Sequence, residues 1–356
     1  MAPLLQGIKD FIEKARSALF GPSIIFEVTP RCNLACKYCY NVWKVRPDYP
    51  QGEMPADDVK VMLGRLLGET CSRHLTFTGG EPLLREDLEE IAVFLRDNGV
   101  AMTMVTNGTL LTEERAQSLF EAGVSMFELP LLAAEPALHD DLAGAEAFHS
   151  TVEAYANARL AGGRVAAVFV ATAKNITQWP EVIKLALALG AEGLSFNRFN
   201  PGGQGVENIA ELALTDKEQL REALHIANEA VDKYGLQIDV PLPTPPCVFS
   251  PKEFPNLQFV GCAAGTKNAY WTLDALGNLR PCNHSPTILG NVLEQSFGHI
   301  VASQKAKCWV GEVAEQCQGC KWLSQCRGGC KASAEVCYGS LKRTDPFVTA
   351  MRGQDI

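Results

Sequence analysis

Between residues 23 and 240 the sequence alternates short apolar segments with amphipathic ones. The apolar segments are rich in Val, Phe and Ile, as buried parallel strands are, and they cover 23–29, 74–80, 101–108, 125–132, 164–172 and 193–199. Helix candidates alternate with them, several beginning at Asp or Thr and ending at Gly, at 56–69, 85–99, 112–123, 147–163, 178–190 and 215–235. Six β–α units predict an α/β fold built as a partial (β/α)6 TIM-like barrel, with an open doubly wound sheet as the alternative.

Two segments of different character flank this region. Residues 1–22 show an amphipathic, helix-like pattern that mixes Lys and Glu and lacks the apolar core of a secretion signal. Residues 241–261 carry six prolines and predict an irregular connection, after which cysteines become frequent and periodicity weakens. We therefore expect an N-terminal helix at 1–22, a barrel at 23–240 and a cysteine-rich domain at 241–356 that bound metal stabilises.

The net charge and the hydropathy of the chain limit which kinds of partner the protein can bind. The net charge of −9 offers no basic field for nucleic acid, and no stretch approaches the ~18 apolar residues that a membrane span needs. We therefore expect a cytoplasmic protein that binds neither nucleic acid nor membrane. In a cytosolic chain, thirteen cysteines favour metal ligands or catalytic thiols over disulfides.

Three of these cysteines lie directly after the first predicted strand, in "RCNLACKYCY". Thiolates at Cys32, Cys36 and Cys39 can wrap a single iron–sulfur cube, although such clusters usually take four cysteines. A missing fourth ligand leaves one metal position open for chemistry, as catalytic zinc sites do. Taken alone, the spacing also permits a zinc site with a borrowed ligand or a set of redox-active thiols.

This motif resembles the signature of the radical S-adenosylmethionine (SAM) enzymes. The resemblance extends to "FTGGEPLL" at the end of the second strand and "TNG" at the end of the third. In that family the amino and carboxylate groups of SAM chelate the open iron. Reductive cleavage then yields a 5′-deoxyadenosyl radical that takes a hydrogen atom from the substrate. The resemblance implies a SAM-binding [4Fe–4S] cluster on Cys32, Cys36 and Cys39.

The resemblance also implies a set of SAM contacts at the strand ends. The Gly-Gly pair would let the backbone approach the methionine amino group, Tyr38 would line the adenine side, and Asn107 would face the ribose. Arg198 would pair with the SAM carboxylate, with a surface arginine at a strand end as the alternative. The implied cofactor-binding residues are Tyr38, Gly79, Gly80, Glu81, Asn107 and Arg198. The fourth strand departs from the family, because Pro130, Leu131 and Leu132 replace the usual hydroxyl and predict a more apolar pocket there.

Seven further cysteines match the SPASM extension of this family, which in relatives holds two auxiliary iron–sulfur clusters. They are Cys262, Cys282, Cys317, Cys320, Cys326, Cys330 and Cys337. The family arrangement implies a distal cluster on Cys317, Cys320, Cys326 and Cys337, and a proximal cluster on Cys262, Cys282 and Cys330. Cys247 or an open iron would complete the proximal cluster. Zinc is the alternative, since Cys-x2-Cys is also a zinc knuckle.

Relatives with this extension modify peptides, as in the pyrroloquinoline quinone pathway and in anaerobic sulfatase maturation. In sulfatase maturation an Asp after the equivalent of Cys282 acts as base; here Asn283 stands there, so His284 is the candidate base. The resemblance implies an oxidoreductase that cross-links or oxidises a peptide or protein side chain and takes electrons from a flavodoxin or ferredoxin. The alternatives are modification of a carbohydrate or tetrapyrrole, and a non-catalytic iron–sulfur or zinc scaffold.

Overall fold

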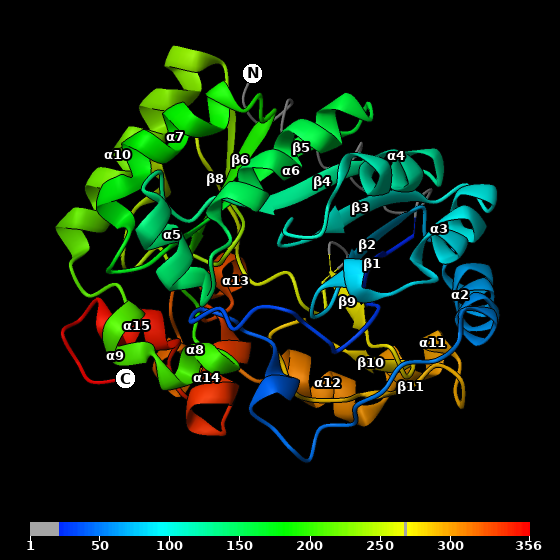
Figure 1. Ribbon diagram of the computed structural model, residues 1–356. Coiled ribbons are helices and arrows are strands. Elements are labelled where there is room, and N and C mark those ends of the chain that lie inside the picture. Colours follow the sequence, from blue (N-terminus) through cyan, green and yellow to red (C-terminus); the bar gives the residue numbers. More distant parts are fainter. Residues whose placement is uncertain (1–20, 267–268) are drawn as a thin grey trace, which may run out of the picture.

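One continuous sheet of eleven strands organises the molecule (Figure 1). The structure is a computed structural model that describes residues 21–266 and 269–356, so the predicted helix at 1–22 falls almost wholly outside it. The strand order is β11-β10-β9-β1-β2-β3-β4-β5-β6-β7-β8. The strands are β1 Ser23–Glu27, β2 His74–Thr78, β3 Ala101–Val105, β4 Val124–Pro130, β5 Arg164–Ala171, β6 Gly193–Arg198, β7 Gln237–Val240, β8 Gln258–Phe259, β9 Tyr270–Leu273, β10 Asn278–Arg280 and β11 Gly290–Asn291.

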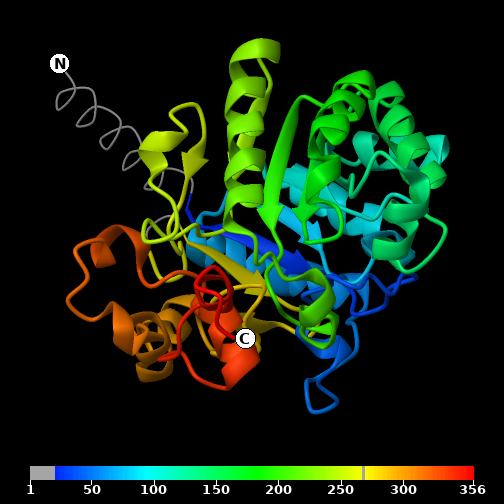
Figure 2. The same cartoon turned by 90° about the vertical axis from the view of Figure 1, so that its left-hand side faces the viewer.

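Helices join the strands and cover the outside of the sheet (Figures 1 and 2). Those of the barrel are α2 Ala56–Thr70, α3 Leu88–Asp97, α4 Glu113–Glu121, α5 Pro136–Ala143, α6 Phe148–Leu160, α7 Trp179–Ala188, α8 Gln204–Glu207, α9 Ile209–Leu212 and α10 Lys217–Tyr234. Those that follow are α11 Phe297–Ala302, α12 Gln304–Gly311, α13 Leu323–Cys326, α14 Lys331–Tyr338 and α15 Pro346–Ala350. Five short 3-10 turns complete the list: η1 Val42–Lys44, η2 Pro82–Leu84, η3 Ile176–Gln178, η4 Pro251–Glu253 and η5 Glu315–Cys317.

The predicted partial barrel is confirmed. Strands β1 to β8 are parallel, and all six predicted β–α units are present. Alternate residues of each strand are buried under the helices, which explains the apolar runs: in β5, for example, Val165, Ala167, Phe169 and Ala171 are buried. Within the described residues, β8 and β11 each pair on one side only, so the sheet does not close into a full barrel.

The cysteine-rich region adds strands to the free side of β1. Strand β9 runs parallel to β1, with Ser23 opposite Tyr270, and β10 returns antiparallel as the predicted hairpin. Its turn ends at Gly277, whose φ of +83° lies in the left-handed region that favours glycine. The sheet therefore continues across residue 240, and the domain boundary drawn there stays a prediction.

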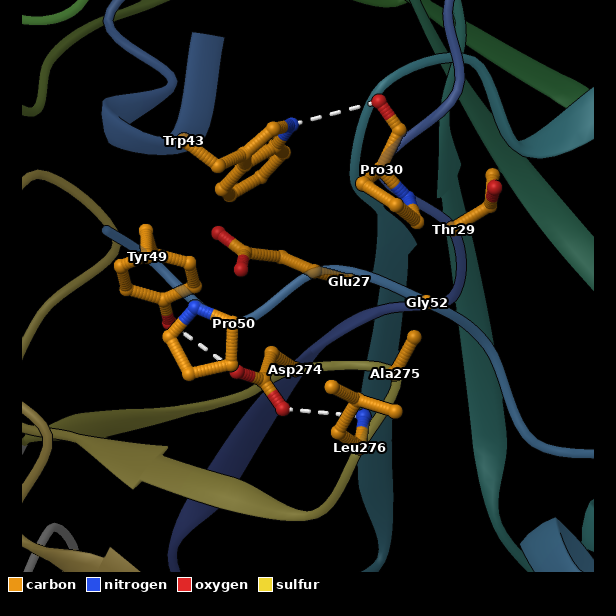
Figure 3. A pocket seen from close by; sticks show the side chains of 10 residues that line it. All are labelled: Glu27, Thr29, Pro30, Trp43, Tyr49, Pro50, Gly52, Asp274, Ala275 and Leu276. Carbon is orange, nitrogen blue, oxygen red and sulfur yellow. Dashed lines mark hydrogen bonds between the residues drawn. The ribbon is translucent and has the colours of Figure 1, made fainter. Parts of the chain in front are cut away.

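A buried polar junction ties the hairpin to the barrel. Glu27 of β1 pairs with Arg280 of β10, and both side chains are almost fully buried. Figure 3 shows the Glu27 carboxylate between the rings of Trp43 and Tyr49, beside a cavity of about 20 Å³ that has room for one water molecule. Burial raises the pKa of Glu27 to about 7, although Arg280 opposes the shift. Removing either partner would leave an uncompensated buried charge, so the pair fixes the hairpin in place.

None of the helices in the described ranges is both long and apolar enough to cross a membrane.

Candidate active site

The loop after β1 brings its three cysteines to the wall of one large cavity. Cys32, Cys36 and Cys39 all line a cavity of about 580 Å³ at the carboxyl ends of the strands, a size typical of cofactor and ligand sites. The backbone N–H of Cys39 donates to the Cys36 carbonyl at 3.1 Å, which closes the turn between them. Burial raises the pKa of the Cys36 thiol to about 12. The Cys36 thiol therefore needs a cationic partner to ionise.

Lys44 is a cation beside all three thiols that sequence reasoning missed. Burial opposes its charged form, but the neighbouring Cys39, Cys32 and Cys36 outweigh this and raise its pKa. Its Nζ also donates to the Leu34 carbonyl at 3.0 Å, which holds the ammonium group inside the loop. Lys44 thus offsets negative charge at the site, as a cation near metal-binding thiolates does.

Ion pairs anchor the outer side of the loop. Lys37 Nζ lies 2.6 Å from an Asp141 carboxylate oxygen and 3.4 Å from one of Glu211. Lys174 contacts the same two carboxylates, so the two lysines and the two carboxylates form a closed network of ion pairs. The Lys37 N–H also donates to the Leu142 carbonyl at 3.0 Å. Although each exposed pair is weak, the network and the backbone bond together restrict the loop.

The Gly-Gly pair after β2 packs on the backbone of the cysteine loop. A Cβ at Gly80 would lie 1.9 Å from the Arg31 carbonyl oxygen, and one at Gly79 would lie 2.5 Å from that of Thr29. The Gly80 N–H donates to the Thr29 carbonyl at 2.8 Å. The structure thus gives these glycines a role that the sequence did not predict, close contact with the cysteine loop. Their predicted contact with the SAM amino group stays a prediction.

Glu81 has a structural role that the sequence did not predict. Its side chain is fully buried, and its carboxylate accepts from Leu83 N–H at 3.0 Å, Thr106 hydroxyl at 2.6 Å and Asn107 N–H at 2.8 Å. Its contact with SAM stays a prediction. Burial raises the pKa of Glu81, while these three bonds favour its ionised form. Glu81 thus ties the end of β2 to the end of β3.

This arrangement predicts a large stability effect for Glu81→Gln. The amide NH2 would face the N–H of Leu83 or of Asn107, leaving a buried donor unpaired at a cost of about 1–3 kcal/mol. We expect a lower melting temperature in thermal denaturation followed by circular dichroism. The exposed Glu86→Gln is the matched control and should melt like the parent protein. Equal melting temperatures for both variants would contradict the proposed role of Glu81.

Tyr38 and Asn107 both line the cavity, as predicted for SAM contacts. The Tyr38 hydroxyl bonds to the Cys36 thiol, and its ring packs beside Leu142 and Phe199. The Asn107 amide donates to Asn33 of the cysteine loop at 2.9 Å. Their contacts with adenine and ribose stay predictions, and both residues also stabilise the loop.

The structure gives Arg198 a carboxylate partner of its own. Its guanidinium lies 2.8 Å from Asp345 near the C-terminus, bonds to the Pro243 carbonyl at 2.9 Å and lies 4.1 Å above the Phe347 ring. The group is 2% exposed. The alternative of a surface arginine is therefore wrong. Arg198 also lines the cavity, and its predicted pairing with the SAM carboxylate stays a prediction.

The extension brings its cysteines together in two places. Cys262, Cys282 and Cys330 surround Tyr270 and form what we call the inner cysteine group; the Tyr270 hydroxyl lies 3.9 Å from Cys282 Sγ. Cys317, Cys320 and Cys326 form the outer cysteine group, in which Cys320 N–H donates to the Cys317 carbonyl at 3.1 Å. In the described part of the chain no three acidic, His or Cys side chains converge on a single-ion site. A cube spreads its thiolates over different irons, so it needs wider spacing than zinc does.

His284 lies between the inner group and the cavity. Its ring stacks on Tyr40 at 4.1 Å, and its Nδ1 lies 3.1 Å from the Asn200 amide nitrogen, which donates. Burial, together with the charges of Arg198 and Arg280, lowers the pKa of His284 to about 3. Because the Asn200 bond occupies Nδ1, the predicted role of His284 as base has no free lone pair in this arrangement. Asn200 also donates to Cys330 Sγ at 3.4 Å.

The fourth strand contributes both Pro130 and a charged residue to the cavity, and the more apolar pocket expected at this strand stays a prediction. Leu131 and Leu132 are buried in the core, whereas Glu128 lines the cavity together with Asp239 of β7. Burial raises the pKa of Glu128, and Asp239 raises it further. The sequence did not identify Glu128 as a cavity residue, because the alternation of apolar and polar residues does not show which face of a buried strand lines a cavity.

Comparison with known protein families accounts for this arrangement. Residues 26–186 match the Radical SAM superfamily, and residues 262–331 match the SPASM iron-sulfur cluster-binding domain. The chain belongs to the radical SAM superfamily. It is therefore an enzyme, as predicted, and the alternative of a non-catalytic scaffold is not favoured.

Curated relatives resemble this radical SAM enzyme over most of its length. A PqqA peptide cyclase of Bradyrhizobium diazoefficiens is 28% identical over 94% of this chain and 89% of its own. An AdoMet-dependent heme synthase of Methanosarcina barkeri is 26% identical over 91% of this chain and 95% of its own.

Solved structures share the fold. Streptococcus suis SuiB, solved with the precursor peptide SuiA, aligns with a TM-score of 0.71 at 16% identity over 96% of this chain and 79% of that one. The protein anSMEcpe, solved with bound AdoMet, aligns with a TM-score of 0.69 at 18% identity over 93% of this chain and 94% of that one. At these identities the likeness establishes the architecture.

The residues present fit the cofactors that the family implies, SAM and iron–sulfur clusters. Three thiols converge beside the Lys44 ammonium on a cavity large enough for a nucleoside ligand. The inner cysteine group lies behind Tyr270, which lines the same cavity.

Proposed function

We propose that this radical SAM enzyme removes a hydrogen atom from a side chain of a peptide or protein and forms a cross-link or an oxidised residue. One observation carries the proposal: the cysteine loop, Tyr270 and the Asn283–His284 segment all line the same cavity. The relatives support the substrate class, since one is a cyclase of the PqqA peptide and SuiB was solved with a precursor peptide. No observation favours a carbohydrate substrate.

In this proposal Cys32, Cys36 and Cys39 hold the SAM-binding cluster. When bound, the cluster and SAM together would supply a group that accepts one hydrogen atom from the substrate. That hydrogen atom would leave the site as part of 5′-deoxyadenosine. The chain's own residues keep the site in order. Lys44 offsets the charge of the thiolates, and Glu81 holds the ends of β2 and β3 in register.

The substrate must then lose a second electron and a proton to give a product lighter by two hydrogens. Tyr270 lines the cavity, and its hydroxyl lies 3.9 Å from Cys282 Sγ. Cys262, Cys282 and Cys330 would hold an auxiliary cluster, which when bound would supply an acceptor for the electron, and we propose that Glu128 or Asp239 of the cavity takes the proton. Cleavage of SAM consumes one electron, which a flavodoxin or ferredoxin would deliver.

The test is co-expression with candidate precursor peptides, chosen from short open reading frames near the gene, followed by mass spectrometry of each peptide. We expect a loss of two hydrogens, and a matching release of 5′-deoxyadenosine from the reconstituted enzyme under anaerobic reduction. A tetrapyrrole is the control substrate, because the heme synthase relative makes it the nearest alternative. Unchanged peptide together with a converted tetrapyrrole would refute the peptide assignment while leaving the radical chemistry intact.

A further inference from the structure

The ligand set of the outer cysteine group differs from the arrangement that the family pattern implies. That pattern assigns Cys337 as its fourth ligand. We propose that Cys247, not Cys337, completes a four-thiolate iron–sulfur site with Cys317, Cys320 and Cys326. The inference rests on the proposed function, because it assumes that the SPASM extension holds iron–sulfur clusters.

Cys247 lies on a turn whose position is fixed. The Val248 N–H donates to the Pro245 carbonyl at 2.8 Å, and the neighbouring Phe249 is 1% exposed. The Pro243 carbonyl accepts from the buried Arg198 at 2.9 Å. Residues on both sides of Cys247 are thus held in the interior while Cys247 itself is exposed. A ligand on such a turn is presented with little loss of conformational entropy.

The same connection packs on the outer group. A Cβ at Gly261 would lie 2.1 Å from the Gln325 carbonyl oxygen, so backbone meets backbone directly before Cys326. In Figure 2 this yellow-green segment runs down to the orange part of the extension. The connection is therefore long enough and close enough to bring Cys247 to Cys317 and Cys326.

The thiols themselves are neighbours. Asp345 links the start of this connection to the segment after Cys326, because its carboxylate accepts from Arg198, which holds the Pro243 carbonyl, and from the Cys330 N–H. With Gly261 packed on Gln325, both ends of the connection lie beside the segment that carries Cys326. Among the thiols, Cys247 interacts most strongly with both Cys317 and Cys326. The backbone N–H groups of Gly328 and Gly329 bond to the Cys326 sulfur, as N–H groups do around cluster thiolates.

Cys337 lies elsewhere. It is part of α14, and the groups that influence its thiol besides burial are Ser333 and Asp345, with no cysteine among them. Asp345 is no substitute ligand, because one oxygen accepts from Arg198 and Cys330 N–H, and the other from Phe347 N–H. Of the described side chains near the outer group, Cys247 is the thiol left to complete it.

The experiment measures iron and acid-labile sulfide in Cys247→Ala and Cys337→Ala, each purified and reconstituted anaerobically as the full chain. We expect Cys247→Ala to lose about four irons per chain relative to the parent, and Cys337→Ala to lose none. The exposed Cys308→Ala is the matched control and should also lose none. Electron paramagnetic resonance of the reduced proteins should show one signal missing in Cys247→Ala alone.

Loss of iron in Cys337→Ala, or full iron in Cys247→Ala, would overturn the inference. Two further measurements, release of 5′-deoxyadenosine and the circular dichroism spectrum, distinguish a wrong ligand assignment from a misfolded protein and from loss of the barrel cluster. Cys247→Ala should retain both the helical spectrum and SAM cleavage, since the barrel cluster is untouched. A parent protein that binds no iron, by contrast, would refute the proposed function itself.

Discussion

Replacing Cys32, Cys36 and Cys39 together by Ala is expected to abolish reductive cleavage of SAM. These three residues are the thiols of the loop that line the cavity, and without them no cluster can deliver an electron to SAM there. Release of 5′-deoxyadenosine, measured by chromatography under anaerobic reduction, should fall to the background of the reductant alone. Iron content should fall by about four per chain, because the cysteines of the extension are unchanged.

The matched control is the double variant Cys71→Ala and Cys308→Ala, which removes two exposed cysteines that lie outside both groups. It should keep its full iron content and its rate of SAM cleavage. Cleavage that persists in the triple variant would rule out the assigned cluster and, with it, the radical mechanism at this loop.

The second large effect is expected for Gly80→Ala. The new methyl group would meet the Arg31 carbonyl oxygen at 1.9 Å, and neither partner is a flexible side chain that can turn aside. Either the loop that carries Cys32 moves away or the end of β2 does, at a cost of ~3 kcal/mol. We expect a lower melting temperature and a loss of the SAM-binding cluster, seen as a fall in iron content and in SAM cleavage.

Gly68→Ala provides the comparison for this variant. Gly68 lies inside α2, and a Cβ there would meet nothing within 4 Å. Alanine should therefore stabilise the helix by about 0.5–1 kcal/mol and leave the cluster intact. If Gly80→Ala also keeps its iron and its melting temperature, close packing does not explain the Gly-Gly pair.

The strands and helices of the barrel were predictable because each buries one face, and burial imposes a period on its own residues. The position of β9 was not, because its pairing with β1 joins residues about 240 positions apart. No local pattern encodes such a contact. The connection at 241–261 was likewise predicted as irregular, although it contains the short strand β8.

At the site, residue type and spacing identified the cysteines, since cluster chemistry demands thiolates at close intervals. The same reasoning left the partners of Glu81 and of Arg198 unknown, because a sequence shows that a charge is present but not what neutralises it. Glu81 is satisfied by hydroxyl and backbone donors, and Arg198 by Asp345, 147 residues later. Lys44 escaped notice for the same reason.

The pairing of β9 with β1 has a consequence for biosynthesis. Strand β1 leaves the ribosome long before the strand that covers its free edge, which ends at Leu273. Until then the nascent chain carries an unprotected edge, and an exposed edge strand recruits other strands and aggregates. A chain truncated after β8 would keep that edge permanently. Attempts to express the barrel alone should therefore yield insoluble protein, however complete its cysteine loop.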